Sequence, residues 1–108
     1  MIPIEYWLIF SSLLLAIGAY GVLSRKNAIV VLMSIEIMLN AANINLVAFS
    51  RYHTVLHPLS DPDATGQVFA LFSIAIAAAE VAVGLAILLT VYRRYKTIDV
   101  DKINILRW

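Results

Sequence analysis

The chain has 108 residues, of which 62% are hydrophobic and 14% charged, and its net charge is +1. This balance lies far outside that of a soluble globular domain and indicates an integral membrane protein. The absence of cysteine excludes disulfides, thiolate chemistry and cysteine-ligated iron–sulfur or zinc sites in this chain. No basic patch with interleaved aromatic residues is found, so we do not expect nucleic acid as a partner.

Three apolar stretches cover about residues 4–23, 28–49 and 67–92. Each is long enough, at ~1.5 Å per residue, to cross a hydrocarbon core of ~30 Å. We therefore predict an all-α integral membrane protein with three transmembrane helices, forming one membrane domain over residues 1–108.

The first stretch differs from a secretory signal peptide. Its N-terminal flank carries Glu5 and no Lys or Arg, and Arg25 and Lys26 follow it without a small-residue cleavage pattern. We expect it to remain as a helix. Only residues 24–27 separate it from the second stretch, which predicts a tight antiparallel hairpin.

The second stretch contains a polar stripe. Glu36, Asn40 and Asn43 share one helix face, and Asn45 adds a further amide. Amides that join helices contribute about 0.6 kcal/mol each, whereas a mid-membrane carboxylate costs roughly 2.5–3.5 kcal/mol on an insertion scale. We interpret the amides as links between helices and Glu36 as a functional group.

The connection at about 50–66 is polar, and Pro58 within it favours turns over continued helix. His53 and His57, spaced i and i+4, would suit a metal if they were helical. Because Pro58 follows at once and no third ligand is evident, we favour a solvated or interfacial loop and predict no metal site.

The third stretch has Glu80 at its centre, with no basic residue nearby in the run. Ser73, Ala77, Glu80 and Gly84 form one stripe of mostly small residues. Small residues let membrane helices approach closely, so this stripe predicts that Glu80 points into a helix–helix contact. Close packing alone does not require a glutamate where Gln or Ala costs less.

Basic residues predict the topology. One side of a three-span protein would hold Arg25, Lys26, Arg93, Arg94, Lys96, Lys102 and Arg107, and the other side only Arg51. The positive-inside rule then places the N-terminus outside and the C-terminus in the cytoplasm. The outer loop is expected at about 50–66 and the cytoplasmic tail at 93–108.

The two intramembrane carboxyls are expected at different depths. Counted from the cytoplasmic helix ends, Glu36 lies roughly 12 Å deep and Glu80 roughly 19 Å deep. A difference of roughly 7 Å is too long for a direct hydrogen bond, so transfer between them requires side-chain motion and water. Three helices cannot surround both carboxyls or supply their counter-charges, which predicts that the chain is a subunit.

Several segments resemble a known family: residues 24–27 (SRKN), 32–50 (LMSIEIMLNAANINLVAFS), 66–87 (GQVFALFSIAIAAAEVAVGLAI) and the ending NILRW. They are similar to subunit K, the 4L-type subunit, of the proton-pumping NADH:quinone oxidoreductase of the respiratory complex I family. The resemblance implies a non-redox subunit of a translocase complex, placed beside a J-type subunit and antiporter-like subunits. It implies no cofactor in this chain, with quinone, NAD(H) or another donor, FMN and iron–sulfur clusters in other subunits.

Carried over to this sequence, the resemblance makes Glu36 and Glu80 the proton-relay carboxyls. Arg25 and Lys26 match a basic cytoplasmic loop implicated in coupling, although setting the topology would by itself explain both cations. The implied location is the bacterial plasma membrane, or the thylakoid membrane for a photosynthetic-type complex.

Two alternatives remain at this point. The chain would otherwise be a small subunit of a multi-subunit Na⁺/H⁺ antiporter, a related assembly without redox activity, or a scaffold whose carboxyls are replaceable. Co-purification of quinone-reducing subunits would support the oxidoreductase over the antiporter. Loss of function on Gln substitution of the two carboxyls would exclude the scaffold.

Overall fold

The computed structural model describes residues 2–103, so the last five residues of the predicted cytoplasmic tail, including Arg107, lie outside the described residues. Three helices make up most of it: α1 (Ile4–Ser24), α2 (Ala28–Leu56) and α3 (Thr65–Tyr95), followed by a short 3₁₀ turn, η1 (Val100–Lys102). All three long helices are apolar enough to cross a membrane. The prediction of an all-α membrane protein with three spanning helices is confirmed.

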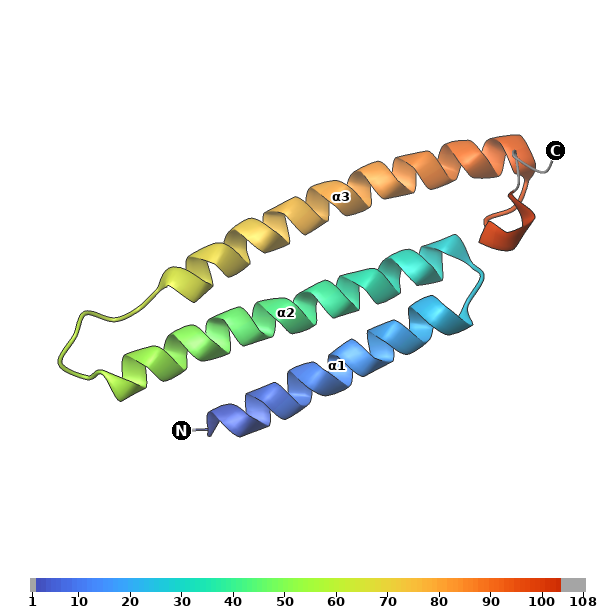
Figure 1. The fold of residues 1–108 in the computed structure, drawn as a ribbon. Coiled ribbons are helices and arrows are strands. Elements are labelled where there is room, and N and C mark those ends of the chain that lie inside the picture. Colours follow the sequence, from blue (N-terminus) through green and yellow to red (C-terminus); the bar gives the residue numbers. More distant parts are fainter. Residues whose placement is uncertain (1, 104–108) are drawn as a thin grey trace.

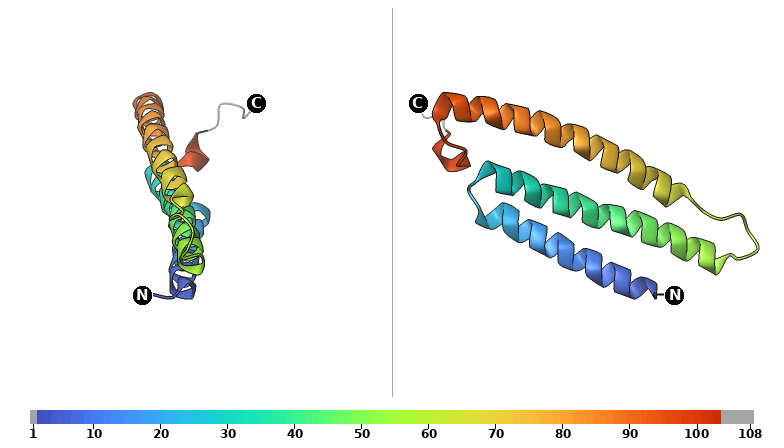
Figure 2. Two further views of the ribbon diagram at one scale, coloured as in Figure 1. Left: turned by 90° about the vertical axis from the view of Figure 1, so that its left-hand side faces the viewer. Right: turned by 180° about the vertical axis from the view of Figure 1, so that it is seen from behind.

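The helices form a single antiparallel layer with α2 in the middle (Figure 1). Seen from the side and from behind, α1 and α3 lie on opposite edges of α2 (Figure 2). One end of the layer, here called the N-terminal end, holds the N-terminus and the α2–α3 loop. The other end, here called the tail end, holds the α1–α2 loop and the C-terminal segment.

The α1–α2 interface is close because glycines face a small residue. A Cβ atom at Gly18 would lie 2.8 Å from the Ser34 carbonyl oxygen, and one at Gly21 would meet the Ser34 hydroxyl. Toward the N-terminal end, the Ser11 hydroxyl donates to Asn45 Oδ1 at 2.6 Å. Close backbone approach and an interhelical hydrogen bond are the interactions that join helices in lipid.

The α2–α3 interface also uses small residues. Ala70 and Ala77 of α3 are buried, Gly66 lies against the Leu46 carbonyl, and a Cβ at Gly84 would lie 3.5 Å from Leu32. The last contact is of ordinary van der Waals length. The two helices therefore pack closely near Gly66 and more loosely toward the tail end.

Helix α2 is longer than the hydropathy pattern predicts. The apolar stretch predicts an end at about residue 49, but the helix continues to Leu56, so the first part of the predicted loop 50–66 is helical. The break comes at His57, whose backbone is non-helical (φ −125°, ψ 66°), as expected before a proline. Twenty-nine helical residues span about 44 Å, so α2 projects beyond a ~30 Å hydrocarbon core.

Helix α3 also extends past its predicted range of 67–92, to Tyr95. Lys96 ends it in the left-handed conformation (φ 59°) and donates its backbone N–H to the Tyr92 carbonyl at 2.7 Å. This is a common helix termination. It turns the chain back toward the α1–α2 loop.

Candidate intramembrane carboxyl site and basic loop

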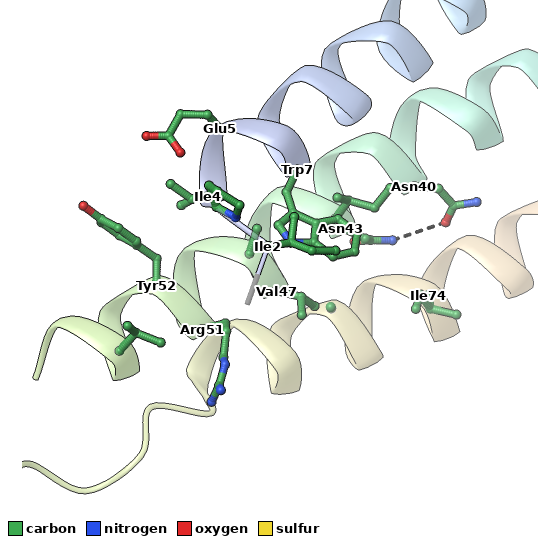
Figure 3. Close-up of a pocket in the computed structure, with 15 residues that line it drawn as sticks. Ile2, Ile4, Glu5, Trp7, Asn40, Asn43, Val47, Arg51, Tyr52 and Ile74 are labelled. Carbon is green, nitrogen blue, oxygen red and sulfur yellow. Dashed lines mark hydrogen bonds between the residues drawn. The ribbon is translucent and has the colours of Figure 1, made fainter. Parts of the chain in front are cut away.

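The polar stripe on α2 is present as predicted from its spacing. Glu36 is half-buried and Asn43 is buried at 6% exposure, while Asn40 is exposed. Asn43 Nδ2 donates to Asn40 Oδ1 at 3.5 Å, a long contact (Figure 3). Asn43 Oδ1 is buried and accepts no hydrogen bond within residues 2–103. The stripe thus retains unused hydrogen-bonding capacity beside Glu36.

Asn45 points to the other side of α2 and has a different role. It accepts the hydrogen bond from Ser11 of α1, which matches the interpretation of the amides as links between helices. Asn40 and Asn43 instead bond only to each other in the described part of the chain. The amides of α2 therefore divide into one interhelical link and one pair beside the carboxyl stripe.

Glu80 lies on the exposed side of α3. The residues of the predicted stripe differ in burial: Ala77 is buried against α2 and Gly84 is half-buried, whereas Glu80 beside them is exposed. Within residues 2–103 Glu80 is therefore exposed and not buried in the predicted helix–helix contact. Exposed Ile76 and Val83 flank it, at 58% and 60% exposure, so the carboxyl is surrounded by apolar surface.

The two carboxyls lie at nearly the same level. Leu32 of α2 faces Gly84 of α3, and each glutamate is four residues further toward the N-terminal end. This register puts Glu36 and Glu80 level to within about one helical turn, ~5 Å. The predicted stagger of roughly 7 Å assumes that Ala28 and Arg93 lie at the same level, whereas α3 extends past the start of α2 (Figure 1).

Within residues 2–103 neither glutamate makes a side-chain hydrogen bond or ion pair; the ion pairs present there are Lys26–Asp101, His53–Asp63 and Lys102–Asp99. A carboxylate in hydrocarbon without a partner is costly. Both groups therefore need donors or water from outside the described part of this chain.

The basic loop at the tail end contains two cations, of which one is ion-paired within the described residues and the other is not. Lys26 Nζ lies 3.1 Å from Asp101 Oδ2, while Arg25 is exposed and makes no ion pair in the described segment. Asn27 caps α2, since its Oδ1 accepts from the Ile29 N–H at 2.9 Å. The two predicted coupling-loop residues are thus separated: Lys26 is paired within the chain and Arg25 is available to a partner.

The C-terminal segment crosses this loop, which the sequence did not reveal. The Ala28 N–H donates to the Ile98 carbonyl at 2.9 Å, and the Val100 N–H donates to the Lys26 carbonyl at 3.0 Å. We call residues 97–102 the tail strap. The two acidic residues Asp99 and Asp101 near the C-terminus, in a chain whose first loop is basic, are a weak sequence signal for such a pairing.

The histidines lie at the N-terminal end of the layer. His53 is on α2, and its ring centroid lies 4.4 Å from that of His57. His53 Nδ1 lies 3.5 Å from Asp63 Oδ2, so folding brings a carboxylate beside one imidazole that sequence reasoning left unpartnered. Across the described residues, no group of three or more metal-binding side chains is found.

Asp63 fastens the α2–α3 loop. Its backbone carbonyl accepts from the Ser50 hydroxyl at 2.6 Å and its N–H donates to Thr54 Oγ1 at 2.8 Å. Its Oδ1 accepts the Thr65 N–H at 3.0 Å. Hydrogen bonds from the Thr65 N–H and hydroxyl lower the pKa of this carboxyl, with a smaller lowering from His53, against an opposing effect of burial.

Fold and site together define a small integral membrane protein of three spanning helices, with one carboxyl deep within the apolar run of each of two adjacent helices, α2 and α3. The sequence model for NADH-ubiquinone/plastoquinone oxidoreductase chain 4L matches residues 6–108. The chain belongs to this family of 4L-type, or K-type, quinone oxidoreductase subunits.

Similar curated proteins agree with this assignment. The NADH-quinone oxidoreductase subunit K of Cereibacter sphaeroides is 52% identical over 108 residues, 99% of each chain. The subunit K of Brevibacillus brevis is 50% identical over 103 residues, covering 95% of this chain and 94% of the relative. The NAD(P)H-quinone oxidoreductase subunit 4L of the Paulinella chromatophora chromatophore is 51% identical over 107 residues, covering 99% and 98%.

Proposed function

We propose that this chain is a membrane-arm subunit of a proton-translocating NADH (or related donor):quinone oxidoreductase, in which Glu36 and Glu80 carry or transmit protons. The full-length similarity to K and 4L subunits supports the assembly. The observation that carries the proton role is a pair of carboxyls at one level on adjacent helices, neither with a hydrogen-bond or ion-pair partner within residues 2–103.

The matched level has an energetic consequence. Packed helix axes are usually 8–10 Å apart, and two unit charges about 10 Å apart interact by about 1.7 kcal/mol at an effective dielectric constant near 20. Protonation of one carboxyl would thus change the proton affinity of the other by about tenfold. This coupling is strong enough to transmit charge state between the helices, with water bridging the remaining distance.

The exposed placement of Glu80 supports a partner on that side. In this proposal a neighbouring antiporter-like or J-type subunit covers the Ile76–Val83 surface and supplies donors to the carboxyl. Arg25, free of ion pairs within residues 2–103, contacts an acidic group of another subunit, while Lys26 holds the tail strap. Quinone, the electron donor, FMN and iron–sulfur clusters belong to other subunits.

The proposed orientation keeps the N-terminus outside and the tail end in the cytoplasm, because Arg25, Lys26, Arg93 and Arg94 all lie at the tail end. The membrane is the bacterial plasma membrane, or a thylakoid-type membrane as in photosynthetic relatives.

Glu36→Gln and Glu80→Gln in the assembled complex test the proposal. We expect each to lower coupled quinone reduction by about tenfold or more, as removal of a proton-transfer group does, with assembly retained because Gln preserves shape. Asp61→Asn is the matched control, since Asp61 is an exposed loop carboxyl. Normal activity and proton yield in both glutamate variants would refute the relay role, and loss of assembly in both would favour a structural role.

A further inference from the structure

An apolar groove opens on one face of the layer at its N-terminal end (Figure 3). Its volume is about 860 Å³, within the range of roughly 300–1,000 Å³ typical of small-molecule sites. The start of α1, the second half of α2 and the start of α3 form its walls. Apolar side chains that line it include Ile4, Trp7, Ile44, Val47 and Ile74.

The length of the groove matches one leaflet of a membrane. Along α2 it extends from Val55, near the N-terminal end, past Arg51 to Asn40. The fifteen residue steps between them span about 22 Å, close to half of a bilayer of ~40–45 Å that includes the headgroup regions. An occupant that fills this groove therefore crosses one leaflet and stops near the middle of the membrane.

The mouth of the groove has two opposite charges. Figure 3 shows Glu5 on α1 and Arg51 on α2 at this end, with their charged groups pointing to opposite sides and Tyr52 on the Glu5 side; all three line the groove. Both charged residues are exposed, and neither forms an ion pair within residues 2–103. Guanidinium groups bind phosphate in a bidentate manner, and Tyr and Trp are enriched at the membrane–water interface.

We propose that this groove binds one phosphatidylethanolamine-type phospholipid from the adjacent leaflet. Its phosphate contacts Arg51, its ammonium contacts Glu5, and one acyl chain lies along Val47 and Ile44 toward Asn40. The charges and the length favour this occupant over a helix of a neighbouring subunit. A spanning helix satisfies its own backbone groups and extends through both leaflets, so it would match neither the paired charges nor the half-membrane length.

The test uses the assembled complex that contains this chain, reconstituted into vesicles of phosphatidylethanolamine and phosphatidylglycerol. The probe is a phosphatidylethanolamine with a photoactivatable diazirine in its acyl chain, and labelled peptides are mapped by mass spectrometry. We expect labelling of Ile44, Val47 and Ile74 in the unmodified protein. This measurement does not depend on any variant assembling.

Variants then test the individual contacts. Arg51→Gln should reduce labelling by about tenfold, because charge-assisted hydrogen bonds are the stronger class, whereas Arg94→Gln at the tail end should not. Val47→Trp should block the groove and abolish labelling, while Ile17→Trp, at an exposed position on α1 outside the groove, should preserve it.

Three results would overturn the proposal. Absence of groove labelling in the unmodified complex excludes the lipid. Crosslinking of a photoreactive residue at position 47 to another protein chain identifies the groove as a subunit interface. Equal labelling by the matching phosphatidylglycerol probe contradicts the recognition of an amine by Glu5.

Discussion

The two helix interfaces of this protein are held in different ways. The α1–α2 interface is held at points along its middle, by Gly18 and Gly21 against Ser34 and by the Ser11–Asn45 hydrogen bond. The α2–α3 pair is instead fastened at its ends, by the hydrogen bonds of Asp63 and by the tail strap. The chain thus forms a tight hairpin and leaves the carboxyl-bearing surface of α3 uncovered.

The largest expected effect comes from adding a methyl group to each interface. In Gly18→Ala the new Cβ would lie 2.8 Å from the Ser34 backbone carbonyl, whereas in Gly84→Ala it would lie 3.5 Å from Leu32. We expect Gly18→Ala to destabilise the hairpin by about 1–3 kcal/mol and Gly84→Ala to have almost no effect. Thermal unfolding of the detergent-solubilised complex measures both; equal losses would show that the two interfaces are equally tight.

The next effect tests the matched level of the carboxyls across the α2–α3 interface. Single and double Gln variants of Glu36 and Glu80 should be non-additive by about 1–2 kcal/mol, roughly a tenfold departure in coupled activity, because the charges interact. The pair Glu80 and Asp61 should be additive, since Asp61 lies in the loop at the N-terminal end. Additivity of the two glutamates would contradict the proposed coupling.

A smaller effect is expected at the tail strap. The side chains of Lys26 and Asp101 are 71% and 46% exposed. Their ion pair therefore stabilises the tail strap by about 0.2–1 kcal/mol, and this stabilisation weakens with salt. Lys26→Gln should speed hydrogen exchange of the Val100 amide, which bonds to the Lys26 carbonyl. Lys102→Gln is the control, because Lys102 pairs with Asp99 within the strap. No change at Val100 would show that the backbone bonds alone hold the strap.

The smallest effect is a pH dependence of the stability of the α2–α3 loop, at the start of α3. The pKa of Asp63 is lowered from 3.8, so its carboxylate stabilises the loop above about that pH, and this stabilisation is lost as the pH falls through the lower folded-state pKa. Hydrogen exchange at the Thr65 amide should therefore accelerate in strong acid. Asp63→Asn should remove the acid transition and Asp61→Asn should keep it; persistence of the transition in Asp63→Asn would assign it to another group.

The sequence predicted which residues enter the membrane but not how far each helix continues beyond it. Hydropathy ended the second stretch near residue 49, yet the helix continues to Leu56, because interfacial residues such as Arg51 and His53 are compatible with helix until a proline approaches. The tail strap was missed because its hydrogen bonds join backbone groups whose pairing leaves little trace in residue type.

The residues of the candidate site were predictable from the sequence, but the direction in which they face was not. Glu36 and Glu80 stand out because a carboxyl in an apolar run is costly wherever it points. Which side of α3 carries Glu80 was not predictable from the stripe of small residues, since Ala77 is buried and Glu80 exposed on neighbouring parts of one helix.

By itself the sequence determined three spanning helices and a carboxyl deep within the apolar run of two of them, because lipid requires long apolar segments whose backbone groups are satisfied internally. Only the tertiary structure decided the level of Glu36 against Glu80, the outward side of Glu80 and the pairing of Lys26 rather than Arg25. An apolar helix has the same hydropathy pattern at any register or rotation against its neighbour, so the pattern does not specify either one. Register and facing are therefore fixed by side-chain packing between helices.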